Sequence, residues 1–173
     1  RVEHPHRQVK RVRVTNGQAS GRHLLGHVHV VQVLLEHMQP ALVENRRHQD
    51  GPARILTLSA DTTHRNFTMG QGLWESNPSD VIDVRFRTTT TDDDGSPATT
   101  TPAGAITTDL THVVYTRDAE GNTTIYTNDT LQADEIITGT TDNWDSSQAF
   151  ALGNELTGDR PWLGTLHLVA IYD

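Results

Sequence analysis

The chain has 173 residues, of which 34% are hydrophobic, with no cysteine and a formal net charge of −8 at pH 7. This length suits a single domain, and a domain of this size buries roughly 70% of its unfolded surface. The absence of cysteine excludes disulfides and thiolate metal sites. No apolar run approaches the ~18 residues needed to cross a bilayer, so we expect no insertion into a membrane.

Charge is divided unevenly along the chain. Residues 1–48 carry 8 Arg and Lys against 3 Asp and Glu, whereas residues 49–173 carry 6 against 19. An acidic body with no lysine after Lys10 argues against nucleic-acid binding. Seven of the ten histidines also lie in residues 1–48. This basic segment either pairs with the acidic body, which we favour, or contacts an anionic partner.

Two strands are expected in the N-terminal part of the chain. Residues 9–14 alternate valine with arginine and lysine, which is typical of a half-exposed edge strand, and Asn16-Gly17 supplies a turn. Residues 24–35 alternate at first and then become continuously apolar. That pattern favours a strand entering the core over a helix.

From residue 51 onward, short apolar runs are separated by Thr, Asp, Gly and Asn, as a two-sheet protein with polar outer faces requires. Residues 88–104 hold four consecutive Thr, three consecutive Asp, two Pro and two Gly, and are expected to form a long exposed loop. The predicted strands are 53–60, 66–72, 81–89, 111–117, 122–128, 131–137, 148–153 and 163–172. That count suits a jelly roll.

Two turns follow each other closely in the second half of the chain. Residues 111–128 predict a β-hairpin, because two β-rich runs flank a turn cluster at residues 118–122. Asn128-Asp129 predicts the next turn, because both residue types tolerate left-handed backbone angles.

The hairpin with His112-Val-Val-Tyr-Thr-Arg-Asp118 precedes Leu152-Gly-Asn-Glu155 and a final strand that starts after Pro161-Trp-Leu-Gly164. This order resembles the C-terminal half of laminin-G-like, concanavalin A-like jelly-roll domains. The resemblance extends back through residues 49–61 and 65–71, so it covers about 49–173.

The resemblance implies an all-β fold, a two-sheet antiparallel β-sandwich of jelly-roll type. Residues 1–173 would then form one domain, in which residues 1–48 are an atypical opening. Members of this family mostly bind carbohydrate or protein outside the cell. The resemblance therefore implies an extracellular or cell-surface location, on a bacterial protein, and a scaffold that leaves the ligand open.

Some concanavalin A-like folds are glucanases with a strand bearing Glu-x-Asp-x-x-Glu, and the nearest candidate here is Asp80-Val-Ile-Asp-Val-Arg85. A retaining glycosidase needs two carboxyl groups about 5–5.5 Å apart. Acids three positions apart face opposite sides of a regular strand, and Arg85 stands where a second acid would be needed. No serine lies in a Gly-x-Ser-x-Gly elbow either. We therefore expect no catalysis.

Calcium is the one candidate cofactor that the sequence suggests. Asp92-Asp-Asp-Gly95 offers Asp92 and Asp94 as oxygen ligands before a glycine, although a solvated loop is the alternative. Family members often bind calcium through an acid in the last strand, where this chain has His167. For zinc, His27 and His29 share a strand face and could act with His23 or His37, without forming a full ligand set.

Sugar binding needs aromatic platforms beside planar polar groups, and Trp74, Trp144 and Trp162 all lie in loop-like contexts. Trp144 is expected to be exposed, whereas Trp162 either contacts ligand or caps the core. Asp61, Asn66 and Asn154 match family-typical positions, where turn formation is the alternative. The candidate ligand-binding residues are Asp61, Asn66, Trp144, Asp145, Asn154, Asp159, Arg160 and Trp162.

These observations predict a non-catalytic recognition module that binds carbohydrate, or else an extracellular or cell-surface protein. The alternative is a structural or adhesive subunit of a surface assembly. It would self-associate through the N-terminal segment or a sheet edge by adding a strand to a neighbour.

Overall fold

A computed structural model describes residues 30–37, 52–73 and 78–172, and the fold within these ranges is all-β. In the part of the chain so described, no helix is long and apolar enough to cross a membrane. The strands are β1 (Val30–His37), β2 (Ala53–Ser59), β3 (Arg65–Gln71), β4 (Ile82–Phe86), β5 (Thr99–Thr100), β6 (Leu110–Arg117), β7 (Asn122–Thr127), β8 (Thr130–Ile136), β9 (Ala149–Leu152) and β10 (Gly164–Tyr172).

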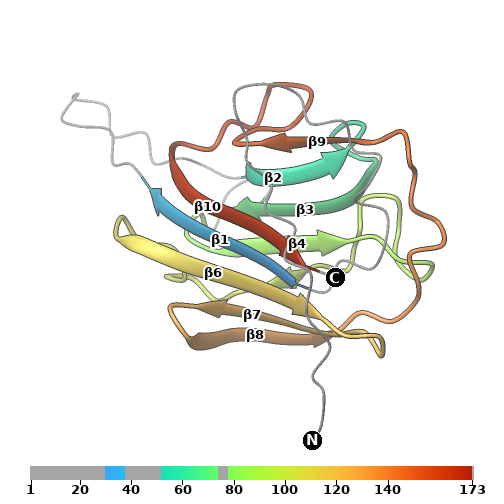
Figure 1. Ribbon diagram of the computed structural model, residues 1–173, viewed down its shortest axis with the longest axis horizontal. Helices are drawn as coiled ribbons and strands as arrows, with labels where there is room; N and C mark the ends of the chain where they lie inside the picture. Colours follow the sequence, from blue (N-terminus) through green and yellow to red (C-terminus); the bar gives the residue numbers. More distant parts are fainter. Residues whose placement is uncertain (1–29, 38–51, 74–77, 173) are drawn as a thin grey trace, which may run out of the picture.

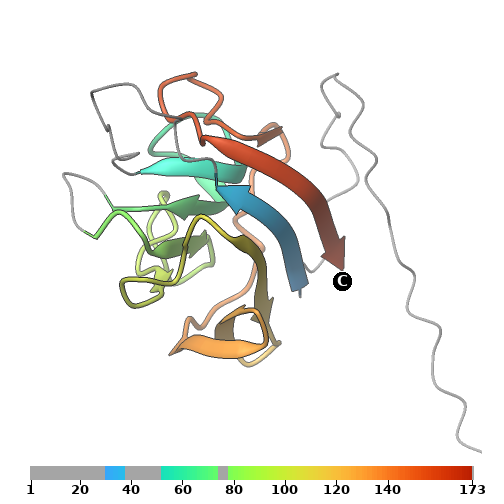
Figure 2. The same ribbon diagram turned by 90° about the vertical axis from the view of Figure 1, so that its left-hand side faces the viewer.

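The strands form two five-stranded sheets that stack as layers (Figures 1 and 2). Sheet A has the order β10-β1-β6-β7-β8, and sheet B has the order β5-β4-β3-β2-β9. All paired strands within both sheets are antiparallel. The first and last described strands, β1 and β10, pair with each other at one edge of sheet A. The predicted antiparallel β-sandwich is confirmed.

The eight strands predicted after residue 51 are all present, with boundaries shifted by a few residues. The turn at residues 118–122 is closed by Asp118, whose Oδ1 accepts the backbone N–H of Asn122 at 2.8 Å. Asn128 and Asp129 have φ angles of 46° and 67°, so the left-handed turn predicted between β7 and β8 is confirmed.

The predicted strand at residues 24–35 is confirmed from Val30 onward, where β1 pairs with both β6 and β10. Residues 9–14, Asn16-Gly17, Trp74 and the histidines at positions 23, 27 and 29 lie outside the described residues. The strand-exchanging N-terminal arm therefore stays a prediction.

The core lies between the sheets and is centred on a group of rings. Phe67 and Phe86 of sheet B meet edge to face at 6.0 Å, and Tyr115 of sheet A lies 5.8 Å and 6.3 Å from them. Arg117 places its guanidinium 5.0 Å from the centre of the Phe86 ring. These contacts join the two sheets with a mixture of apolar burial and cation–π attraction.

The segment at residues 88–104 differs from the exposed loop that composition predicts. Thr88 and Thr101 are buried, and the short strand β5 lies within the segment. The hydroxyl of Thr88 donates to the carbonyl of Thr138 at 2.7 Å, and Thr99 bonds Thr123 at 2.8 Å. Threonine can be buried when its hydroxyl finds a partner, which is why the composition was misleading.

The two sheets differ in how their strands are buried. In β6, inward residues are buried and outward residues are partly exposed, in the alternation expected of a sheet with one open face. In β2 and β3 every residue is buried, although several outward side chains are polar or charged. The outer face of sheet B is therefore covered, and the covered polar groups there define the candidate site.

Candidate functional site

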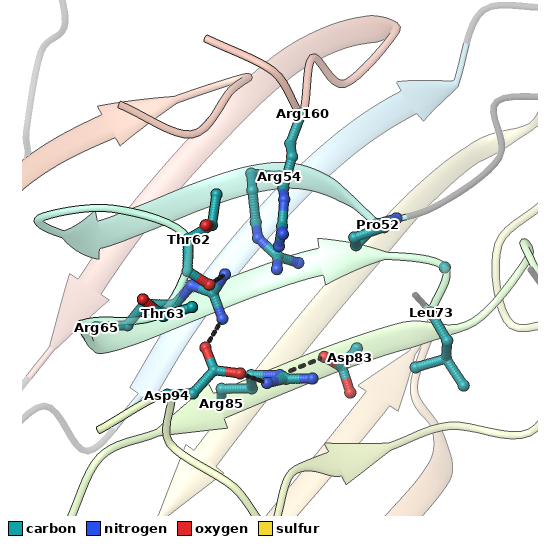
Figure 3. A pocket seen from close by; sticks show the side chains of 11 residues that line it. Pro52, Arg54, Thr62, Thr63, Arg65, Leu73, Asp83, Arg85, Asp94 and Arg160 are labelled. Atoms are coloured by element: carbon teal, nitrogen blue, oxygen red, sulfur yellow. Dashed lines mark hydrogen bonds and ion pairs between the residues drawn. The ribbon is translucent and has the colours of Figure 1, made fainter. Parts of the chain in front are cut away.

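A pocket of about 330 Å³ opens on the outer face of sheet B (Figure 3). Its size is at the lower end of the range for small-ligand sites, which is about 300–1,000 Å³. The lining residues come from β2, β3 and β4 and from the loops beside them: Pro52, Arg54, Thr62, Thr63, Arg65, Gly72, Leu73, Asp83, Arg85, Asp94 and Arg160. Four of the eleven are arginines, and we call this cavity the arginine pocket.

Glu155, in the loop between β9 and β10, anchors one side of the pocket. Its carboxylate lies 3.3 Å from Nε of Arg54 and accepts hydrogen bonds from Ser59 and from Thr57, the latter at 3.2 Å. Arg54 and Thr57 are three positions apart, so a regular strand would place them on opposite faces. A register shift between Arg54 and Leu56 brings them to the same face, in the manner of a β-bulge.

Arg65 and Arg85 continue the network across the sheet. Nε of Arg65 lies 3.4 Å from Glu155, and its Nη1 pairs with Asp94. The second oxygen of Asp94 pairs with Arg85, whose Nε lies 3.2 Å from Asp83. Cations and carboxylates thus alternate from β2 to β4. Figure 3 shows the part of this line that runs from Arg65 through Asp94 and Arg85 to Asp83.

Gly70 on β3 leaves the space that the Arg54 side chain occupies. A Cβ atom at position 70 would lie 2.8 Å from Nη1 of Arg54 and 2.6 Å from the carbonyl oxygen of Ala53. Both distances are too short for a side chain, so glycine is required if Arg54 is to keep this position.

The guanidinium of Arg54 is buried and only partly satisfied. Its Nη1 has no hydrogen-bond acceptor among the described residues. Burial lowers the pKa of Arg54, and the nearby charge of Arg160 lowers it further. Burial likewise lowers the pKa of Arg65, with the charge of Arg54 as the next cause. The guanidinium groups are therefore close enough to repel one another, despite the carboxylates between them.

Of the residues that the sequence proposed for ligand binding, Arg160 lines the pocket. Trp162 does not, because it is buried in the core and its indole N–H donates to Gln71 at 3.0 Å. The sequence predicted that Trp162 either contacts ligand or caps the core, and the structure places its side chain in the core.

Trp144 is not the exposed platform that its loop context predicts. The ring is half-buried against the core, 5.1 Å from Phe86, and its indole N–H donates to the carbonyl of Arg87 at 2.6 Å. The loop folds back onto the sandwich, so the side chain contributes to packing, and the expectation of exposure is wrong.

The remaining proposed ligand residues have structural partners. Asn66 and Asp145 exchange two hydrogen bonds of 2.8 and 3.0 Å, which tie β3 to the loop before β9. Asp61 caps the turn between β2 and β3 by accepting the N–H groups of Thr63 and His64. Asn154 accepts two backbone N–H groups, and Asp159 accepts the hydroxyl of Thr157. For Asp61 and Asn154 these contacts match the alternative role of turn formation, whereas Asn66 lies within β3 and joins two distant segments.

The residues proposed for calcium make contacts within the protein. Both oxygens of Asp94 pair with arginine, and Asp92 accepts the backbone N–H groups of Asp94 and Ser96. His167 in the last strand lies 3.3 Å from Glu36. In the described ranges no group of three or more His, Asp or Glu is arranged to hold a metal ion. Calcium binding through Asp92 and Asp94 stays a prediction that these contacts do not favour.

A comparison with protein families matches residues 45–173 to the concanavalin A-like lectin/glucanases superfamily. The chain belongs to this superfamily. The matched range begins four residues before the start of the resemblance at residue 49, and it contains every residue of the arginine pocket.

Among solved structures, this superfamily member is similar to domain 4 of AbnA, a GH43 extracellular arabinanase from Geobacillus stearothermophilus, in complex with arabinotriose. The two share 15% identity with a TM-score of 0.48, over 84% of this chain and 60% of that one. LamAcat from Zobellia galactanivorans shares 14% identity with a TM-score of 0.40, over 84% of this chain and 64% of that one. The chain thus spans less than two thirds of either structure, and a search of curated proteins gave no match.

Sequence reasoning missed Arg54, Arg65 and Glu155, which build the pocket of this sandwich. A signal was present in the composition, because residues 49–173 contain six cationic residues, all arginine. Arg54 falls in the predicted strand at residues 53–60, and Arg65 directly precedes the predicted strand at residues 66–72. Arginine is rarely buried without a partner, so arginines in the strands of an acidic segment indicate a polar site.

Proposed function

We propose that the protein is a non-catalytic carbohydrate-binding module and that the arginine pocket is its binding site. The extracellular location expected from the sequence is part of the same proposal. Support comes from membership of a superfamily of lectins and glucanases and from a polar cavity on one face of the sandwich.

The observation that carries the proposal is the covered outer face of sheet B. Arg54, Arg65 and Asp83 are all buried there, each beside a cavity that remains open. Burying charged groups costs free energy unless they are paired, and a structural face would be built more cheaply from apolar residues. Retained, hydrogen-bonded charges around a cavity supply the directed donors and acceptors that hydroxyl-rich ligands need.

The pairing of the pocket carboxylates supports a non-catalytic role. Asp83 accepts Arg85 Nε at 3.2 Å and the hydroxyl of Thr100 at 2.7 Å. The side chain of Glu155 is fully buried beneath Arg54, Thr57 and Ser59. A glycosidase needs one carboxyl group as acid and another as base or nucleophile at the sugar, and these groups already hold the sheet face together.

A glycan array tests this proposal directly. The full chain would be applied with calcium and again with a chelator, beside a Thr62→Tyr variant that fills the pocket without removing a charge. We expect the wild type to bind a defined glycan class equally in both buffers and Thr62→Tyr to lose at least tenfold in affinity.

Thr130→Tyr is the matched control, because Thr130 is an exposed residue on β8 of the other sheet. It should bind as the wild type does, and thermal melting would check that both variants fold. A blank array for the wild type would contradict the proposed function, and full binding by Thr62→Tyr would place the site elsewhere.

Self-association through the N-terminal segment is the other function that the sequence proposed. Size-exclusion chromatography of the full chain and of a chain lacking residues 1–20 tests it. Oligomers that disappear on deletion would support the arm, whereas a full chain that elutes as a monomer would exclude it.

A further inference from the structure

Resting on the proposed carbohydrate-binding function, we infer that the arginine pocket selects acidic sugars, in which a carboxylate or sulfate group enters between its guanidinium groups. The inference concerns the chemistry of the ligand, and it can fail while carbohydrate binding holds.

The first support is the distribution of charge. Four of the six cationic residues in 49–173 line this one cavity, in a segment that carries 19 acidic residues. The four are Arg54, Arg65, Arg85 and Arg160, and the acids among and beneath them are Asp83, Asp94 and Glu155. The lining itself thus holds four cations against two anions, Asp83 and Asp94, while Glu155 and Asp159 lie near Arg54. Cations gathered at one cavity of a strongly acidic body attract ligands of the opposite charge to that cavity.

The second support is a donor that the protein leaves unused. Nη1 of Arg54 is buried without an acceptor in the described part of the chain, and Figure 3 shows the Arg54 guanidinium directed into the pocket. A buried donor without an acceptor destabilises the fold, because its desolvation is not compensated by a hydrogen bond. An oxyanion in the cavity would provide the missing acceptor and reduce the mutual repulsion of Arg54 and Arg160, the two cations whose interaction lowers the pKa of Arg54.

The third support is the chemistry of the lining. None of the described residues around the pocket is aromatic, so these residues offer a bound sugar polar and charged groups rather than a stacking ring. Arginine instead offers a planar fork of N–H donors that matches carboxylate and sulfate oxygens two at a time. Arg85 is partly exposed at the pocket, with 22% of its side chain accessible, so it can meet a ligand from solvent.

The inference is tested by isothermal titration calorimetry on the full chain with three trisaccharides of matched size. The first is a trimer of galacturonic acid, with a carboxylate on each unit. The second is a sulfated trimer of galactose, and the third is a neutral trimer of galactose. We expect at least one acidic trisaccharide to bind tenfold or more tightly than the neutral one. The advantage should shrink as salt rises from 50 to 500 mM.

Variants separate the pocket from the general charge of the protein. Arg160→Gln removes a cation from the pocket lining and should abolish most of the preference for the acidic sugar. Arg87→Gln removes one charge outside the pocket, where Arg87 pairs with Asp93 at 2.7 Å, and should leave the preference intact. If Arg160→Gln does not fold, Arg85→Gln serves the same purpose.

Each outcome has a definite meaning. Tighter binding of the carboxylate, the sulfate or both supports an oxyanion site and identifies which group it takes. Equal binding of the neutral sugar would overturn the inference and keep the proposed function. Heat from none of the three, together with a blank glycan array, would overturn both.

Discussion

The outer faces of the two sheets show two ways to make a polar surface on one sandwich. On sheet A, residues such as Thr116 and Thr124 are half-exposed, and their hydroxyl groups form a hydrogen bond of 2.7 Å. The polar groups on this face therefore need only solvent and neighbouring side chains as hydrogen-bond partners. On sheet B, Arg54 and Arg65 are buried and depend on Glu155, about a hundred positions away in the chain. The first face requires little of the rest of the fold, whereas the second needs the whole domain to assemble before its charges are matched.

The largest expected effect follows from this dependence. Glu155→Ala removes the carboxylate beneath Arg54 and Arg65 and leaves two buried cations without their shared partner. Breaking a buried pair from one side costs about 3–5 kcal/mol. We expect the free energy of unfolding, measured by urea denaturation, to fall by that amount.

Glu120→Ala removes the same charge from an exposed turn and should change stability by less than about 0.5 kcal/mol. If the two variants were equally stable, the buried network would not be the feature that distinguishes sheet B.

A second prediction concerns Trp144, which joins the loop before β9 to the rings of the core. Trp144→Ala should lower the free energy of unfolding by about 3 kcal/mol, the low end for a large aromatic ring. Trp144→Phe keeps a ring against Phe86 but loses the bond to the Arg87 carbonyl, so it should cost only about 1 kcal/mol.

Binding separates packing from recognition at this residue. If Trp144 were the exposed ligand-binding residue that the sequence alone predicted, Trp144→Ala would weaken sugar binding, whereas the structure predicts unchanged affinity below the melting temperature. A tenfold loss of affinity in a folded Trp144→Ala variant would restore the stacking platform and count against the arginine pocket.

The smallest expected effect separates an exposed acid from the buried ones. The pKa of Asp61 is lowered mainly because the backbone N–H of Thr63 donates to it, with the His64 side chain as the next cause. A carboxyl group whose pKa is lower in the folded state stabilises the fold above its unfolded pKa, and this contribution is lost as pH falls. Asp61→Asn should therefore be less stable than wild type at pH 7, and the difference should shrink below about pH 4.

Asp109→Asn is the control, because Asp109 is exposed and its carboxylate accepts no hydrogen bond from the described residues. Urea midpoints at pH 7 and pH 2.5 give the comparison. A stability difference for Asp61→Asn that stays constant across that range would show that its carboxylate charge does not contribute.

The fold could be predicted from the sequence because its signals are local. The turn at residues 118–122 and the pair Asn128-Asp129 each fix a hairpin within a few residues, and the alternation of β6 and β7 identifies their inward faces. The site could not be predicted in the same way. Arg54 and Glu155 are separated by 101 positions, and a bulge in β2 decides which face Arg54 occupies.

Two errors share a physical cause. Polar composition at residues 88–104 and loop context at Trp144 both suggested exposure, yet Thr88 is buried and Trp144 is half-buried. In each case a hydrogen bond to a backbone carbonyl, of Thr138 or Arg87, makes burial possible. Composition does not reveal such partners, because they are provided by distant segments.

The most direct test of the arginine pocket is an NMR titration of the full chain that follows the side-chain Nε–H signals of its arginines. On addition of an acidic trisaccharide, the account predicts that the signals of Arg54, Arg65, Arg85 and Arg160 shift together, while those of Arg87 and Arg117 remain in place. Saturable shifts confined to residues of sheet A, or shifts at Arg117 without any at Arg54 and Arg160, would contradict it.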